Sequence, residues 1–260
     1  MRKSVPTIVA AMSASLLLAG GASAASLITN GSFETNGGTG QVNYNTALAG
    51  WNVQPLNTSY FFVFNPQAGT VSGTSADNAG APGEYDHAPA PNLKLWGPGD
   101  GSNNGLSNSP DGGAFIGSDP RYQNSAITQT INGLVKGDSY KLEFYFAGAQ
   151  QFGYDGPTTE GWHVSLGGAA AQNTVVLANV NHGFTGWNKA TMFFVADSTS
   201  DTLSFLATGG PNATLPPFAL LDGVSLSVAP EPTTWALMII GFGGIGAMAR
   251  SKRRGVAATA

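Results

Sequence analysis

Hydrophobic residues recur at every second position in several stretches of the chain, the pattern of strands with one buried face. In 140–146, large apolar side chains at the even positions alternate with Lys141, Glu143 and Tyr145. The same alternation predicts strands at 162–166, 192–196 and 203–205. Further strands are predicted at 50–53, 60–64, 92–96, 114–117, 126–131, 174–179 and 218–228. Between the two termini, no stretch shows the 3.6-residue period of an amphipathic helix.

Glycine-rich turns separate the predicted strands, for example at 132–133, 136–138 and 167–168. Many short strands joined by such turns favour an all-β fold, and specifically an antiparallel β-sandwich. Two longer stretches, 67–91 and 97–113, are rich in Gly, Asn, Ser, Asp and Pro and are predicted to be loops. Cysteine is absent, so residues 25–228 must form one domain with a core that needs no disulfide.

The N-terminus has the three parts of a signal peptide in the right order. Arg2 and Lys3 are followed by an apolar stretch at 8–18 and by small residues around Ala24, which fit a cleavage site. This order favours a signal peptide over the alternative, an N-terminal core helix. We therefore predict that residues 1–24 are removed on export.

The C-terminus combines a rigid tripeptide, a short apolar segment and a basic cluster. It resembles the PEP-CTERM sorting signal in its Pro-Glu-Pro-x-x-Trp-Ala variant, through Pro230, Glu231, Pro232, Trp235, Ala236, Arg250, Lys252, Arg253 and Arg254. The resemblance implies that the tail, 229–260, is held in the inner membrane and processed by exosortase-type machinery, and that the domain reaches the cell surface or the extracellular matrix. The apolar segment, 235–249, is shorter than the roughly 20 residues of a spanning helix. This sorting helix is therefore expected to be a transient anchor.

Removing both termini changes the charge. Residues 25–229 contain five basic and fourteen acidic residues, a net charge of −9, although the whole chain carries −4. Such a domain repels phosphate backbones, so nucleic acid is excluded as a partner. The acidic excess suits divalent cations and neutral, hydroxyl-rich ligands.

Several short motifs of the body follow one another in a familiar order: Asn30–Glu34, Gly50-Trp51, Pro110–Phe115, Gln129–Ile131 and Leu220–Leu226. This order resembles the galactose-binding-like jelly roll of carbohydrate-binding modules and bacterial surface proteins. The resemblance implies that Glu34 and Asp222 are ligands of a structural calcium ion. Asp222 shares strand parity with Leu220 and Val224 and would point into the core. A bulge, a hydrogen-bonded partner or a cation could each accommodate it.

A sugar site needs rings beside amide and carboxylate groups. The candidate rings are Trp96, Tyr85, Tyr122 and Tyr154, and their polar neighbours in sequence are Asn103, Asn104, Asp100, Arg121 and Gln151. For each ring, capping the edge of the core is the alternative. Trp51, Trp162 and Trp187 open or alternate with strands and are interpreted as core.

Catalytic signals are sparse. Glu84, Asp86 and His87 share one loop, and Glu160 lies near His163, so a glycoside hydrolase is one alternative. His163 alternates outward and His182 falls in a turn, with no metal-ligand spacing. The sequence therefore predicts an exported, non-catalytic surface or matrix protein that binds polysaccharide or exopolysaccharide, without a catalytic cofactor. A purely structural biofilm or adhesion component is the other alternative.

Overall fold

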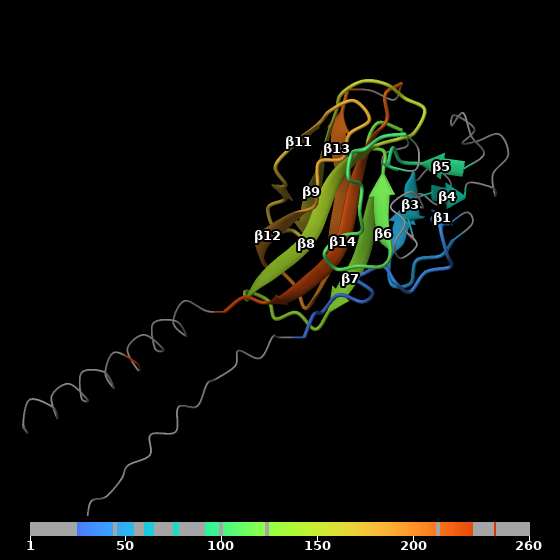
Figure 1. Cartoon of the computed structure of the whole chain (residues 1–260). Helices are drawn as coiled ribbons and strands as arrows, with labels where there is room; N and C mark the ends of the chain where they lie inside the picture. The colour runs from blue at the N-terminus through green and yellow to red at the C-terminus, as the bar shows by residue number, and fades with distance from the viewer. Residues whose placement is uncertain are drawn as a thin grey trace, which may run out of the picture.

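The computed structural model describes residues 25–43, 46–54, 60–64, 75–77, 92–98, 101–122, 125–211 and 214–230, together with residue 242 (Figure 1). The predicted signal peptide and all of the sorting tail beyond Pro230, apart from Phe242, lie outside these residues. None of the helical structure described is long and apolar enough to cross a membrane.

Two antiparallel sheets form the domain. The first sheet has the strand order β1-β3-β6-β14-β8-β12, with bounds β1 Gly40–Gln41, β3 Phe61–Phe64, β6 Phe115–Ser118, β8 Ser139–Gln150, β12 Asn188–Val195 and β14 Pro217–Val228. The second has the order β10-β9-β13-β7-β2, with β11 also paired to β9; its bounds are β2 Asn52–Gln54, β7 Ala126–Asn132, β9 Thr158–Leu166, β10 Gln172–Asn173, β11 Leu177–Asn179 and β13 Ser200–Gly210. A separate ladder pairs β4 (Ser75–Asp77) with β5 (Asn92–Lys94). The predicted all-β antiparallel sandwich is confirmed.

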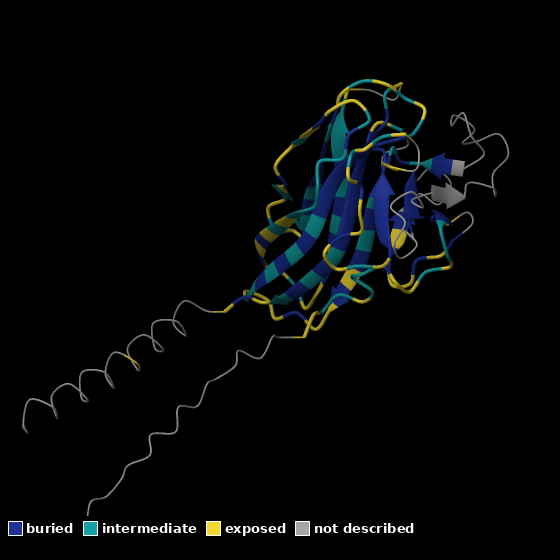
Figure 2. Ribbon diagram, in the orientation of Figure 1, coloured by how far each residue is buried: buried dark blue, intermediate teal, exposed yellow. Residues whose placement is uncertain are grey.

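The main core lies between the two six-stranded sheets. Alternate residues of β8 and β13 point into it, which gives the banded burial along the strands in Figure 2. Phe205 of β13 is fully buried at its centre, with ring centroids 5.1 Å from Phe144, 6.1 Å from Trp162 and 6.2 Å from Trp51. Rings from both sheets therefore meet here, and Trp51 and Trp162 are core residues as predicted.

A second, smaller apolar cluster covers the outer side of β3 and β6. Phe62, Phe64 and Phe115 contribute to it, together with Leu93 of β5 and Phe218 of β14. The four residues of β3 are all buried because Phe61 and Val63 face the main core while Phe62 and Phe64 face this second cluster. Both faces of β3 are thus covered, which explains why its sequence is a continuous apolar run rather than an alternation.

The structure corrects several predicted boundaries. Of the strand expected at 174–179, only Leu177–Asn179 forms a strand, β11, because residues 174–176 do not continue the ladder with β9; β10 lies just before the predicted range. β4 forms within the stretch 67–91 that was expected to be loop, and β1 was not predicted, because two or three residues are too few to show alternation. Trp187 is half-buried against the second cluster rather than inside the main core.

The two ends of the sandwich differ. At one end, here called the loop end, residues 119–122, 151–157 and 180–187 connect or follow β6, β8 and β11 (Figure 1). At the other, here called the tail end, β8 begins, β12 and β14 finish, and the chain continues to Pro230 (Figure 1). The long pair β8 and β14 connects the two ends.

Replacing Phe205 by alanine is expected to lower the free energy of unfolding by about 3–5 kcal/mol, because the cavity would lie where rings of both sheets meet. The matched control is Phe193→Ala on β12, whose side chain is 55% exposed. It should stay within about 0.5 kcal/mol of the parent chain. Urea unfolding measures both, and equal losses would contradict this assignment of the core.

Candidate functional site

Three half-exposed rings gather at the loop end. Trp96 stacks on His182, with ring centroids 3.8 Å apart and planes inclined by 23°, and Phe152 lies 4.5 Å from Trp96. Trp96, Phe152 and His182, here called the ring cluster, come from three separate loops. Backbone bonds hold two of these loops together, since Trp96 N donates to Gln150 O (2.9 Å) and Phe152 N donates to Lys94 O (2.9 Å).

Polar contacts fix the orientation of each ring. Trp96 Nε1 donates to the backbone oxygen of Tyr154 (3.0 Å), and His182 Nε2 lies 2.6 Å from Asp155 Oδ1. The backbone N of His182 donates to Gln150 Oε1 (2.6 Å), and φ of His182 is +55°. The turn therefore holds the imidazole against the indole, with the exposed Asp155 carboxylate at its edge.

Asn104 was predicted as a partner for sugar hydroxyls, but its side chain forms hydrogen bonds with the backbone of the loops. Its Nδ2 donates to Trp96 O (2.7 Å) and to His182 O (3.0 Å), and its Oδ1 accepts from Leu106 N (2.9 Å). Ser102 Oγ also donates to His182 O (2.7 Å). Asn104 thus links the Trp96 and His182 loops from behind. Asn103 is exposed and Gln151 is buried.

The other predicted rings divide into separate groups. Tyr122 packs edge-to-face on Tyr60 (4.9 Å) and caps the second apolar cluster. Capping the edge of the core was the expected alternative to sugar binding for this ring. Tyr154 contacts the ring cluster through its backbone oxygen, which accepts from Trp96 Nε1. The pKa of its phenol is raised, mainly by burial and also by the negative charge of Asp119. Arg121 is exposed, and its backbone N donates to Asp119 Oδ1 (2.7 Å). Tyr85 and Asp100 lie outside the described residues.

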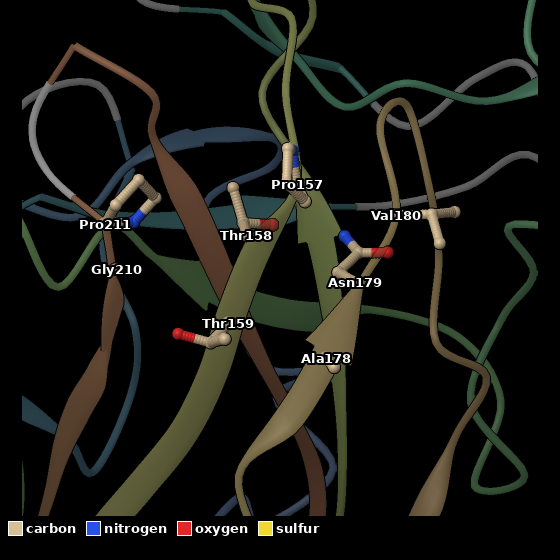
Figure 3. A pocket seen from close by; sticks show the side chains of 8 residues that line it. All are labelled: Pro157, Thr158, Thr159, Ala178, Asn179, Val180, Gly210 and Pro211. Atoms are coloured by element: carbon tan, nitrogen blue, oxygen red, sulfur yellow. The ribbon is translucent and has the colours of Figure 1, made fainter.

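A pocket of about 480 Å³ opens at the loop end among β9, β11 and β13. Pro157, Ala178, Val180 and Pro211 supply apolar walls, and Thr159 and Asn179 add a small polar part (Figure 3). Thr158 also lines the pocket, but its hydroxyl is buried. The backbone N of Gly156 donates to the side chain of Asn181, which ties the 151–157 loop to the 180–187 loop. The pocket and the ring cluster therefore share the same two loops.

Glu160 and His163 do not form a catalytic pair. Glu160 is fully buried on the inner side of β9, whereas His163 faces outward and bonds Asn173 Oδ1 at 2.8 Å. Among the described residues, neither carboxylate oxygen of Glu160 has a hydrogen-bond partner at normal geometry. Burial raises the pKa of Glu160 to about 8, and the Thr158 hydroxyl opposes that shift. The other predicted cluster, Glu84, Asp86 and His87, lies outside the described residues.

A more polar groove of about 390 Å³ runs along the first sheet, near β8 and β14. Glu143 lies on its wall and bonds both Lys141 (2.7 Å) and Lys189 (3.0 Å), which holds its pKa below the ordinary value. Tyr145 supplies an aromatic ring to the wall of the groove, and Lys189 Nζ lies 6.0 Å from the centroid of that ring. This groove is the second place where a ligand could meet an aromatic side chain.

Asp222 is fully buried, but it does not point into the main core as its parity predicted. It pairs with the outward-facing Tyr145 of β8, whereas Val224 and Leu226, beyond a register shift in β14, face the core. The Ser109 hydroxyl bonds its Oδ2, the backbone N of Gly223 donates to its Oδ1 (2.7 Å), and β14 has a register shift directly after it. Burial, reinforced by the charges of Asp111 and Glu34, raises the pKa of Asp222 to about 8, despite the opposing bonds from Ser109 and Gly223. Two of the three expected solutions, a hydrogen-bonded partner and a bulge, are therefore present together.

The calcium prediction can be compared with this geometry. Glu34 Oε1 accepts from Ala114 N (2.6 Å), and Gly31 O accepts from Val224 N (2.9 Å), so these two oxygens already have protein donors. No three His, Asp or Glu side chains in the described part of the chain form a group that could hold a metal ion. Calcium takes six to eight oxygen ligands, so backbone carbonyls or water would have to complete a site at Glu34 and Asp222. Glu34 and Asp222 as calcium ligands stay a prediction.

Sequence reasoning missed Phe152, Asp155, His182 and Ser109. His182 was placed correctly in a turn, but its contact with Trp96 joins positions 86 residues apart, and no local pattern carries that information. Ser109 pairs with Asp222 over 113 residues. Phe152 and Asp155 lie within two residues of the candidate ring Tyr154, so the stretch around it could have pointed to them.

Comparison with known proteins finds one family match. Residues 228–254 match the PEP-CTERM protein-sorting motif, which confirms the predicted signal and indicates an exported protein processed at the membrane. A comparison with curated proteins finds no match.

Among solved structures, the chain is similar to TmCBM61 in complex with β-1,4-galactotriose, with 13% identity, a TM-score of 0.38 and coverage of 78% of this chain and 99% of that one. It is similar to a CBM4 structure, with 18% identity, a TM-score of 0.30 and the same coverages of 78% and 99%. It is also similar to the N-terminal cellulose-binding domain of β-1,4-glucanase C from Cellulomonas fimi, with 16% identity, a TM-score of 0.26 and coverages of 48% and 93%. These likenesses concern the fold alone.

The buried acids predict an unusual dependence of stability on pH. Burial raises the pKa of Asp119 to about 7 and those of Glu160 and Asp222 to about 8. The folded chain then binds more protons than the unfolded chain between the ordinary and raised pKa values. The free energy of unfolding should therefore fall between about pH 5 and about pH 9, by on the order of a few kcal/mol.

Glu160→Gln should reduce this fall, because the amide stays neutral at every pH. Glu143→Gln is the control, since the lowered pKa of Glu143 acts in the opposite direction. Urea unfolding across the pH range measures both, and an unchanged slope in Glu160→Gln would contradict the assignment. Should calcium hold Glu34 and Asp222 instead, a chelator would lower the melting midpoint at neutral pH.

Proposed function

We propose that this chain is an exported, non-catalytic protein whose β-sandwich binds polysaccharide through the ring cluster at the loop end. The observation that carries the proposal is the convergence of Trp96, Phe152 and His182, half-exposed and held in place by hydrogen bonds. A pyranose presents an apolar face of C–H groups and a rim of hydroxyls. Rings held in fixed positions match the apolar face of the sugar, and no loop has to be ordered when the ligand binds.

The polar groups beside the rings supply the rest of a sugar site. The Asp155 carboxylate is exposed at the edge of His182 and accepts hydrogen bonds, as hydroxyl donors require. Thr159 and Asn179 add polar groups to the adjoining pocket, whose walls are mainly apolar. Ligand sites commonly combine apolar walls with a few such polar groups. The acidic domain does not repel neutral sugars, so a polysaccharide built of neutral sugars is the favoured ligand.

Binding without cleavage is supported by where the acids lie. Glycoside hydrolysis uses two carboxyl groups that face each other across the scissile bond. At the loop end, Asp155 is exposed, but Asp119 and Glu160 are both enclosed in the protein. Asp119 bonds the backbone of its own turn, and Glu160 faces the interior of the sandwich.

The sorting motif supports the cellular setting of the proposal. A protein that leaves the cytoplasm and is processed at the membrane can meet extracellular polysaccharide, including the cell's own exopolysaccharide. We propose that the inner-membrane anchor is transient and that the domain ends at the cell surface or in the matrix.

Native gels that contain soluble polysaccharides provide the test, because binding retards the chain. Trp96→Ala should weaken affinity for a retarding polysaccharide by about tenfold or more, since tenfold corresponds to roughly 1.4 kcal/mol, the scale of one lost ring contact. Trp96→Phe keeps a ring and should retain most of the affinity. Melting of each variant shows whether the fold is intact.

Tyr145→Ala is the matched control, because it removes a ring from the sheet groove and leaves the loop end unchanged. Loss of affinity in Tyr145→Ala with none in Trp96→Ala would move the site to that groove. No retardation by any of a broad set of neutral and acidic polysaccharides would contradict the proposal and favour a purely structural surface role.

A further inference from the structure

An apolar patch lies at the tail end, where a soluble domain would be expected to present polar groups. Phe193 and Val195 of β12 are each 55% exposed, and Val228 of β14 is 51% exposed. Phe193 and Val228 line one groove of about 450 Å³, together with Gly137, Asp138, Ser139, Ala229 and Pro230. Val195 pairs in register with Ser139, so it borders the same groove. We call Phe193, Val195 and Val228 the tail-end patch.

The alternation of β12 explains why these side chains are outside. Met192 and Phe194 point into the core, which leaves Phe193 and Val195 on the outer face. β12 is the last strand of its sheet, so among the described residues no further strand of that sheet pairs with its outer edge. The outer face of β12 is also open, since Phe193 and Val195 are exposed there. Val228 pairs with the core-facing Tyr140, but at the end of β14 it is exposed and lines the same groove as Phe193. Large apolar side chains exposed around one groove mark a surface that contacts something apolar.

The chain itself indicates what that contact is. Pro230 lines the groove, and the apolar run of the sorting tail begins at Trp235. The intervening residues span at most about 18 Å even when fully extended. When the apolar run is in a bilayer, the tail-end patch is therefore held within that distance of the lipid surface. Phe and Val side chains are suited to the boundary between headgroups and acyl chains.

We propose that the tail-end patch rests on the membrane surface while the sorting tail is inserted, so that Phe193, Val195 and Val228 contact lipid. The polar surroundings fit this position, because exposed Lys136 lies in the adjoining turn and can meet lipid phosphate. The domain is then held by two contacts, the inserted tail and the patch. Cleavage of the tail leaves only the weaker one, and the domain is released.

The absence of cysteine makes the test direct, because one introduced thiol carries a dye to one position. The full chain is reconstituted into phosphatidylcholine vesicles, with an environment-sensitive fluorophore on Val195→Cys. The control is Val176→Cys, at a position 70% exposed on the other sheet's edge. The dye at 195 should shift to the blue and be quenched several-fold more by lipids with a spin label near the headgroup. In a Phe193→Ser background, that difference should shrink.

Two results would overturn the proposal. Equal quenching at 195 and 176 in chains that float with the vesicles would show that the domain stands clear of the lipid. A dye at 195 that is shielded from iodide but not reached by the lipid quencher would show that protein covers the patch, either the tail itself or a second copy. Chains that fail to float with the vesicles would also overturn it, because the tail then does not anchor them.

Discussion

Trp162 and Phe205 lie on neighbouring strands of one sheet, and Phe144 meets Phe205 from the other; no disulfide joins the two layers. An exported domain without cysteine depends on such contacts alone for its cohesion. The layer of rings also sets where everything else lies, because the alternation that turns these side chains inward turns Lys141, Glu143 and Tyr145 to the groove and Phe193 and Val195 to solvent. The polar and apolar outer surfaces are consequences of one inward-facing pattern.

Acidic groups buried among apolar residues complicate that interior. Asp222 has two hydrogen-bond donors, whereas Glu160 lies close to Gly148, where any larger side chain would collide with its carboxylate. A buried carboxyl of this kind favours its neutral form. Enclosing these carboxyls therefore costs the domain some stability as the pH rises toward neutral. Gly148 is an example of a small residue required by a neighbour on another strand.

The sequence was most informative where a property repeats locally. Alternation located the long strands β8, β9, β12 and β13, and the ordered C-terminus identified the sorting motif, because each depends on neighbours in the chain. The site was only partly predictable. Trp96 and Tyr154 were named as candidate rings, but the stack of Trp96 on His182 and the structural role of Asn104 arise from contacts between distant loops. Strands of two or three residues, such as β1 and β4, were missed because so short a segment contains no period.

β14 has twelve residues, and it joins the loop end to the point where the tail begins. At about 3.3 Å per residue, such a strand is roughly 40 Å long. Its antiparallel partner β8 is equally long and stiffens it. The pair acts as a spacer of fixed length between the two ends of the domain. It keeps the loop end, with Trp96, far from the surface to which the tail is attached and pointing away from that surface. Shortening or lengthening both strands by matched pairs of residues would change that stand-off in steps of about 7 Å without altering either end.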